Sequence, residues 1–488
     1  MNQYIYKSAT ELAKLIREGK ATSYDIIKEH LQQIKEHNDK LNALISIFEE
    51  EALQEASMCD KEVKEGKFRG PLHGVPVTIK EQFWIKGKNS NTNFKMLKDF
   101  VAPEDAVIIG RIRKSGAIIL GQTNVPKNLI DYQVRGDIYP EGKNPYNTDY
   151  SPGGSTGGGA AALAAGFTPL ELGGDFGGSV RVPSNFCGLY GLKTTERTVP
   201  VHGNIPLPKN ADTFIVHMAV AGPLARNIDD LELLWKIIIG PDEGDRNIPD
   251  INWRQPTEKL FTDYKIAWTD QWPGYKTSAQ ISGAIKSFAE TLEKSGCNIE
   301  KKIPDESLHK DSLKVFVGLF PYVIAQGTPW FIRAIIKMQL HAGFLKGMKK
   351  DSPDFIKEMN KGFKLNANHY GRIMLQRGLI TKRWEMFFNE YDFLICPVAF
   401  GPSYKRCKTG IKLNYDGTEM IYANYVWPYN ACFNASGNPS ITIPLGLGKE
   451  GLPMGVQIVG KYWCEPELIH FAKQVAALTE GFVKPNGY

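Results

Sequence analysis

The chain has 488 residues, of which 42% are hydrophobic and 23% charged, as is typical of a globular protein with an ample core. Its net charge is only +6, and no basic run typical of nucleic-acid binding occurs. The seven cysteines are scattered without a CxxC pair, which argues against a disulfide framework or zinc knuckle and favours a reducing cytoplasm. Residues 1–20 are too polar for a signal peptide, and the longest uncharged stretch, 151–170, has too much glycine and serine to cross a membrane. We therefore expect a cytoplasmic protein that binds neither nucleic acid nor membranes.

The first 67 residues carry helical signals. Ser8 and Glu11 form a capping box, and apolar residues follow at helical spacing. A second start signal at 22–25 precedes an apolar stripe of Ile27, Leu31 and Ile34. We expect an amphipathic helical lead-in whose role is packing.

From residue 70 onward, strand-like runs alternate with helical patterns. Runs rich in β-branched residues lie at 75–79, 117–120 and 393–395, and residues 106–115 have a helical pattern. This alternation predicts an α/β fold with a central mixed sheet covered by helices on both faces.

No linker or internal repeat divides the chain. We therefore expect a single large domain over residues 1–488. Within it we distinguish the lead-in at 1–67, a core at 70–200 and a variable section of substrate-side helices at 240–390.

One segment of the variable section is amphipathic. Pro329 is tolerated at the first position of a helix. A stripe at helical spacing follows it, formed by Ile332, Ile335, Ile336, Leu340 and Phe344. With its lysines and arginine, this segment fits a core helix, a cap over a pocket or an interfacial membrane helix, and the sequence leaves the three open.

Two glycine-rich loops carry the chemical signal. The first is SPGGSTGGG at 151–159, and the second is GGDFGGS at 173–179. Glycine permits backbone conformations closed to other residues and lets a substrate approach backbone N–H groups. Consecutive N–H donors aimed at one point can form an oxyanion hole.

Four interpretations of these loops compete. A phosphate-binding loop is disfavoured because its GxxxxGK[ST] pattern is absent. GGSTG at 153–157 matches a nucleophile elbow, but the proline-containing approach at 144–152 cannot be a strand, and no later histidine stands out as the base. The glycines could also serve close packing alone. The fourth interpretation is a serine hydrolase with a lysine base.

Lys80 is the candidate base. It ends the apolar run at 75–79, and a lysine that enters a sheet interior loses hydration, which lowers its pKa toward a useful range. A lysine after a strand is more often a surface residue, so the neighbouring motifs decide its interpretation.

Those motifs resemble the amidase signature family. GPLHGVPVTIK at 70–80 is similar to the family's lysine strand, and the two glycine loops resemble its central signature. Further similar blocks follow the family's order and cover most of the chain except the middle: SGAIILGQTN at 115–124, NP at 144–145, FCG at 186–188, GLK at 191–193, GPLAR at 222–226, GNPS at 437–440 and GVQ at 455–457.

The resemblance implies roles for individual residues. Lys80 would be the base, Ser155 a bridging serine on a cis peptide bond, and Ser179 the nucleophile. The oxyanion hole would use the backbone N–H groups of Phe176, Gly177, Gly178 and Ser179. Thr156, Asp175 and Arg181 would support the loops. The chemistry requires no metal or cofactor, and no Asp, Glu and His residues have metal-ligand spacing.

The chain departs from the family pattern at three places. Thr156 replaces a usual serine, Gly174 a usual threonine, and Glu81-Gln82 a usual Asp-Asn pair. Lys80-Glu81 resembles the fatty-acid-amide-hydrolase branch more than the tRNA-dependent amidotransferase subunits. We expect Cys187 and His73 to be structural.

The expected function is hydrolysis of a small carboxylic amide, with an apolar acyl or aryl group, to an acid and an amine or ammonia. An amidotransferase subunit that supplies ammonia to a partner, an esterase and a non-catalytic binding protein are the alternatives. The sequence leaves a homodimer open.

Overall fold

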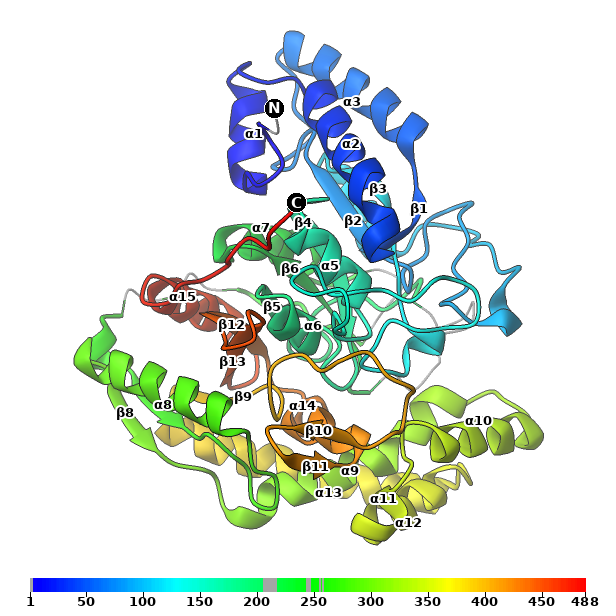
Figure 1. Ribbon diagram of the computed structural model, residues 1–488, viewed down its shortest axis with the longest axis vertical. Helices are drawn as coiled ribbons and strands as arrows, with labels where there is room; N and C mark the ends of the chain where they lie inside the picture. The colour runs from blue at the N-terminus through cyan, green and yellow to red at the C-terminus, as the bar shows by residue number, and fades with distance from the viewer. Residues whose placement is uncertain (1–2, 205–216, 243–246, 254–255, 257–258) are drawn as a thin grey trace.

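The computed structural model describes residues 3–204, 217–242, 247–253, 256 and 259–488. Some residues of two predicted sections lie outside this description: 1–2 of the lead-in, and 243–246, 254–255 and 257–258 of the variable section. At the centre is an eleven-stranded sheet in the order β1-β3-β2-β4-β6-β5-β12-β13-β9-β7-β8 (Figure 1). Strands β10 and β11 form a separate two-stranded sheet.

The strands have the following bounds: β1 Leu44–Ile47, β2 Pro76–Lys80, β3 Ile118–Thr123, β4 Leu170–Asp175, β5 Tyr190–Lys193, β6 Val220–Ala225, β7 Lys265–Trp268, β8 Asn298–Lys301, β9 Phe393–Pro397, β10 Leu413–Tyr415, β11 Thr418–Met420, β12 Ser440–Leu447 and β13 Pro453–Gly460.

The α-helices are α1 Ala9–Arg17, α2 Ser23–Leu41, α3 Glu49–Lys64, α4 Val107–Lys114, α5 Gly157–Ala164, α6 Arg181–Phe186, α7 Ile228–Ile238, α8 Ala279–Lys294, α9 Glu306–Ala325, α10 Trp330–Ala342, α11 Met348–Asp351, α12 Pro353–Gly362, α13 Ala367–Glu390, α14 Trp427–Ser436 and α15 Glu465–Ala476. Short 3-10 helices are η1 Lys95–Leu97, η2 Lys127–Leu129, η4 Phe261–Asp263 and η5 Tyr422–Tyr425.

The sheet is mixed. Strand β2 runs parallel to β3 and β4, and β7 runs parallel to β8 and β9, whereas the strands from β4 through β6, β5, β12 and β13 to β9 pair antiparallel. Because β2 and β4 are parallel neighbours, their carboxyl ends meet at the same edge of the sheet. Lys80 and Asp175 are the last residues of these two strands, so this edge brings them together.

Side-chain alternation assigns the residues of β2 to opposite faces of the sheet. Val77 and Ile79 belong to a core cluster that includes residues of α1, α4, α7, α8 and α15. Thr78 and Lys80 therefore face the other side, where α5 packs against β2 and β4. Helices α5 and α14 are buried along their whole lengths. Helices thus cover both faces of the mixed sheet, and the expected α/β architecture is confirmed.

Local start signals in the lead-in are confirmed. The Ser8 side chain accepts from the Glu11 N–H, the Glu11 carboxylate accepts in return from the Ser8 N–H, and Thr22 caps α2. The stripe on α2 is buried, with Ile27 and Ile34 fully enclosed.

Two expectations of purely helical sections need correction. The lead-in also contains β1, which pairs antiparallel with β3 at the edge of the sheet. The section at 240–390 contains β7 and β8, which extend the sheet at its other end. Each of these strands has only four residues, too few for an alternating pattern to be distinctive.

Along the long axis of the molecule, α1–α3 lie near one end and α10–α12 near the opposite end (Figure 1). Within the described part of the chain, every helix is too short or too polar to traverse a lipid bilayer.

Candidate active site

Lys80 lies fully buried at the end of β2. Its Nζ donates to Ser155 Oγ at 2.8 Å and to the Gly174 carbonyl oxygen at 3.0 Å. Burial lowers the pKa of Lys80 to about 7, although the carboxylates of Asp175 and Glu171 oppose this shift. A neutral amine next to a serine hydroxyl can accept that hydroxyl's proton near neutral pH.

Ser155 follows a cis peptide bond from Gly154, as the family resemblance implied. The surrounding glycines allow close packing: a Cβ on Gly154 would lie 2.3 Å from the Asp131 carbonyl oxygen, and one on Gly158 would lie 2.4 Å from the Asn124 nitrogen. Close packing is therefore a real requirement of this loop, and it coexists with the contact between Ser155 and Lys80.

Asp175 organises the turn that carries Ser179. Its carboxylate accepts the N–H groups of Gly178 at 2.9 Å and Val180 at 3.1 Å, and the Arg181 guanidinium binds both of its oxygens. Burial alone would raise the pKa of Asp175, but Arg181 holds it well below its usual range. Asp175 and Arg181 therefore hold the shape of the loop, and their supporting role in catalysis stays a prediction.

The four expected oxyanion donors divide into two groups. The N–H groups of Gly177 and Gly178 point to Asp175 Oδ1, at 3.3 and 2.9 Å. The N–H groups of Phe176 and Ser179 donate to no acceptor in the part of the chain that the structure describes. Within the described ranges, the N–H groups of Phe176 and Ser179 are therefore available in this conformation, and the oxyanion role of all four residues stays a prediction.

Thr156 joins the two loops. Its N–H donates to the Ser179 carbonyl oxygen at 3.2 Å, and its hydroxyl donates to the Gly174 carbonyl oxygen at 3.4 Å. Ser155 and Ser179 thus lie on adjoining loops, next to the end of β2 where Lys80 lies. Over the described ranges, no hydrogen bond links the hydroxyls of Ser155 and Ser179, so a proton transfer between them stays a prediction.

Ser179 lines an apolar cavity of about 80 Å³. Aromatic rings dominate the wall, and Phe176 stacks on Phe320 with ring centroids 5.4 Å apart. The cavity shares lining residues with a larger groove of about 1020 Å³ under α10, namely Ile130, Asp131, Leu340 and Phe344. A substrate that reaches Ser179 through this apolar surface gains affinity from each methylene it buries.

Comparison with known proteins identifies the family. The family model described as Amidase matches residues 25–469, which is most of the chain. The chain belongs to the amidase family.

Relatives of this amidase include a glutamyl-tRNA(Gln) amidotransferase subunit of Alkaliphilus metalliredigens (strain QYMF). It is 30% identical over 472 residues, covering 92% of both chains. The fold also resembles solved structures of two hydrolases. One is 6-aminohexanoate cyclic dimer hydrolase, with a TM-score of 0.79, 22% identity and coverage of 99% of each chain. The other is fatty acid amide hydrolase, with a TM-score of 0.78, 22% identity and coverage of 98% of this chain and 86% of that one. The leaning toward the fatty-acid-amide-hydrolase branch stays a prediction.

Helix α10 of this amidase is not a core helix. Trp330 is 73% exposed and Ile335 42%, and Leu340 is the buried residue of the helix. Pro329 is the N-cap, one position before the first helical residue. All five members of the predicted stripe line the groove, four of them on α10 and Phe344 just beyond its end, and Leu340 and Phe344 also line the cavity: Ile332, Ile335, Ile336, Leu340 and Phe344. This exposure argues against the core interpretation, and the groove that α10 borders fits a cap over a pocket.

The two departures at Gly174 and Gln82 fit each other. A Cβ on Gly174 would lie 2.5 Å from Gln82 Oε1, closer than side-chain atoms approach. The long Gln82 side chain thus occupies space that a threonine at 174 would need. The sequence does not show this relation, because the two positions are far apart in the chain and meet only in the fold.

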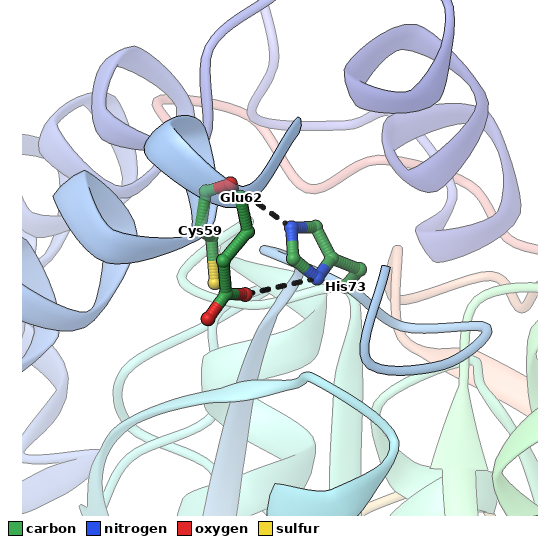
Figure 2. Close-up of side chains that lie close together, drawn as sticks. All are labelled: Cys59, Glu62 and His73. Atoms are coloured by element: carbon green, nitrogen blue, oxygen red, sulfur yellow. Dashed lines mark hydrogen bonds and ion pairs between the residues drawn. The ribbon is translucent and has the colours of Figure 1, made fainter. Parts of the chain in front are cut away.

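Cys187 and His73, the two side chains expected to be structural, form hydrogen bonds with backbone groups of the protein. The Cys187 thiol is buried, its Sγ donates to the Pro152 carbonyl oxygen at 3.5 Å, and burial raises its pKa. His73 lies near Cys59 and Glu62, and the three offer ligand-type atoms within 4.8 Å of one another (Figure 2).

This trio is held by bonds within the protein. His73 Nδ1 accepts the Arg69 N–H at 3.2 Å, so its Nε2 carries the proton donated to the Cys59 carbonyl oxygen at 3.1 Å. The Arg69 guanidinium engages both oxygens of Glu62, and burial raises the pKa of Cys59 to about 11. A protonated thiol and an imidazole with both nitrogens engaged are poor metal ligands. The geometry fits the structural role expected of His73.

Several residues of the site escaped the sequence analysis. Asp131 and Tyr132 line the cavity, and the Tyr132 hydroxyl donates to the Gly177 carbonyl oxygen at 2.6 Å. They lie between two signature blocks and follow no motif. Phe316 and Phe320 come from α9, in the section that the resemblance does not cover. An aromatic residue at helical spacing is typical of any core helix, so no signal in the sequence would have singled them out.

Proposed function

We propose that this amidase hydrolyses carboxylic amides through an acyl-enzyme on Ser179. The observation that carries the proposal is the 2.8 Å contact between Lys80 Nζ and Ser155 Oγ, made by a lysine whose pKa is lowered to about 7. Membership of the amidase family and the position of Ser179 on the wall of an apolar cavity support the proposal.

The steps follow from this geometry. Neutral Lys80 takes the proton of Ser155, which takes the proton of Ser179 as the Ser179 oxygen attacks the amide carbonyl. The N–H groups of Phe176 and Ser179 stabilise the oxyanion. The same relay returns a proton to the leaving nitrogen, since an amide anion leaves poorly. Water then attacks the acyl-enzyme, the acid is released, and Ser179 is restored.

Labelling with a fluorophosphonate probe tests the assignment. We expect the probe to modify the peptide that contains Ser179, and Ser179→Ala to lose both the label and nearly all turnover. A Ser155→Ala variant that keeps its fold should be labelled slowly at Ser179, because only its relay is lost. A label on Ser155 in the unaltered protein would contradict the proposal and support the elbow interpretation.

The second candidate function is an amidotransferase subunit that passes ammonia to a partner. It is favoured by the relatives named as glutamyl-tRNA(Gln) amidotransferase subunits, which are 28–30% identical over nearly the whole chain. The isolated chain distinguishes the two functions: turnover of simple amides without partners supports the amidase. Matched ester and amide rates test the esterase alternative, and complete absence of turnover would favour a binding protein.

We further propose a small amide with an apolar acyl or aryl group as substrate and the cytoplasm as the site of action. The aromatic cavity beside Ser179 supports the apolar substrate. The seven free cysteines, six of them buried, support the cytoplasmic location. Fractionation of cells that express a tagged chain tests the location. The native mass of the purified chain tests whether it forms a homodimer.

A further inference from the structure

Asp131 lies where the cavity at Ser179 meets the groove under α10, and it lines both spaces. Among the described residues of the cavity wall it is the one carboxylate in otherwise largely apolar surroundings. The backbone around it is fixed, because its carbonyl oxygen packs against Gly154, next to Ser155. Its position relative to the reacting groups is therefore set by the same loop that holds the lysine–serine pair.

Neutral donors hold the Asp131 carboxylate in place. Oδ1 accepts the Tyr132 N–H at 2.7 Å and the Tyr422 hydroxyl, and Oδ2 accepts the Thr409 hydroxyl. In the described part of the chain, no lysine or arginine forms an ion pair with it. The nearby Arg135 guanidinium instead donates to Glu141 and to the Cys407 carbonyl oxygen. The carboxylate is thus oriented by hydrogen bonds without being neutralised.

A carboxylate in this setting favours a cationic ligand. Burial raises the pKa of Asp131 to about 6, while its three hydrogen bonds and Arg135 oppose the shift, so the group is ionised at neutral pH. An ionised carboxylate only accepts hydrogen bonds, and toward the apolar cavity the charge faces no partner of opposite sign. On the groove wall, Lys127 and Arg135 pair with Asp137 and Glu141, and Lys408 is the third basic residue there. A protonated amine donates hydrogen bonds to the carboxylate and carries the opposite charge, whereas a methyl group of similar size does neither.

The apolar cavity suits the acyl part of the substrate. After the amine leaves, the acyl group remains bound to Ser179, while the amine must depart and water must enter. The side chains of Ile130, Leu340 and Phe344 border the same passage as Asp131 and can contact methylene groups between the carbonyl and a terminal substituent.

We propose that Asp131 makes the enzyme selective for amides whose acyl chain carries a protonated amino group at the far end. This inference rests on the proposed amidase function. The substrate class is thereby narrowed to ω-aminoacyl amides, in which apolar methylenes fill the cavity and the ammonium binds the Asp131 carboxylate at the passage to the groove.

The test compares anilides of ω-aminoacyl chains with n-acyl anilides in which a methyl group replaces the ammonium, over a series of chain lengths. A hydrogen bond to a charged group contributes about 1.5–3 kcal/mol, so kcat/KM for the best amino substrate should exceed that of its methyl counterpart roughly tenfold or more. In Asp131→Asn this ratio should fall to about one or below, through a higher KM for the amino substrate.

Asp137→Asn is the matched control. Asp137 lines the same groove, but its carboxylate is paired with Lys127 at 2.9 Å, so its removal should leave the ratio unchanged. The proposal is overturned if the unaltered enzyme prefers the methyl series at every length, or if a folded Asp131→Asn keeps the ratio. Should Asp131→Asn fail to fold, the preference of the unaltered enzyme decides.

Failure of the proposed function is distinguishable from failure of this inference. If turnover persists in Ser179→Ala, Ser179 is not the nucleophile, and the ratio of the two series still tests Asp131. If neither series is hydrolysed, the proposed amidase function fails. Calorimetric binding of the same substrate pairs then still tests whether the protein prefers the ammonium. Equal affinities would reject the role of Asp131 independently of catalysis.

Discussion

At the scale of single residues, two buried lysines differ in what they contact. Burial lowers the pKa of both Lys80 and Lys193 to about 7. Lys80 donates to the Ser155 hydroxyl, whereas Lys193 donates to the carbonyl oxygens of Thr194 and Asn438. A lowered pKa therefore does not identify a base by itself, and the neighbouring hydroxyl makes the difference.

The pH profile of the enzyme should report Lys80. Because the base acts in its neutral form, kcat/KM should be low at acidic pH, rise through a midpoint near pH 7 and reach a plateau above it. Lys80→Ala should lower kcat/KM by at least about 10²-fold, the low end for general-base catalysis. Stopped assays in a series of buffers measure the pH profile of the unaltered enzyme and the loss of kcat/KM in Lys80→Ala.

Lys193→Ala is the control for this profile. It should lower stability, because it removes a buried donor from two carbonyl oxygens, but it should leave the midpoint of the acid limb in place. Lys80 would be excluded as the base if Lys193→Ala shifted the midpoint of the acid limb, or if Lys80→Ala kept most of its activity.

Gly174 and Gln82 should behave as a coupled pair. Gly174→Thr alone forces the Gln82 amide to move. Because this amide is the far end of a flexible, half-buried side chain, the loss of unfolding free energy should be about 1 kcal/mol, the low end for overpacking. In the double variant with Gln82→Asn, the shorter side chain leaves room for the threonine, and much of the loss should be recovered. Urea unfolding of both single variants and the double variant measures the coupling, and strictly additive losses would show that the two positions are independent.

At the scale of elements, the same apolar periodicity produces different outcomes. On α2 the stripe is buried between neighbouring elements, whereas on α10 it faces a groove and much of the helix is exposed. Periodicity indicates which residues share a face, and it does not indicate what covers that face. The position of α10 beside the cavity could therefore not be predicted from the sequence.

The groove-facing side of α10 should control acyl-chain preference. Each buried CH₂ contributes about 0.8 kcal/mol, so kcat/KM for n-acyl amides should rise roughly three- to fourfold per methylene until the cavity is full. Ile335→Asp should flatten this trend for long chains and spare short ones. The kinetics are measured beside thermal melts.

Met338→Asp is the matched control on the same helix. Met338 is 64% exposed and is not part of the groove lining, so the chain-length trend should persist in this variant. A flat profile in the unaltered enzyme, or equal effects of the two substitutions, would reject the role of α10.

At the scale of the whole molecule, Arg181 connects segments that are far apart in the chain. Besides Asp175, its guanidinium donates to the Asn430 carbonyl oxygen, the Asn434 side chain and the Gln457 side chain. It thereby joins the turn of Ser179 to α14 and β13. The side chains of Arg181 and Asp175 are fully buried.

Arg181→Met should be strongly destabilising. It leaves the buried Asp175 carboxylate with hydrogen-bond donors but without its ion-pair partner, which typically costs about 3–5 kcal/mol. Arg383→Met is the control: Arg383 pairs with Asp305 and Asp311 at the surface, so its loss should cost about 1 kcal/mol or less. Urea unfolding of the two variants compares them, and similar small losses would show that the buried pair contributes little to stability.

The sequence by itself determined the α/β class, the start signals of α1 and α2, the end of β2 at a lysine, and the two glycine loops. These features depend on local periodicity, on capping residues and on motifs of neighbouring residues, which are written directly in the chain. Only the tertiary structure decided that β1, β7 and β8 extend the sheet, that α10 borders a groove, and that Asp131 lines the same cavity as Ser179. It also turned two of the expected oxyanion donors toward Asp175. Each of these depends on contacts between segments distant in sequence or on the direction of a single backbone group, and no local pattern encodes either.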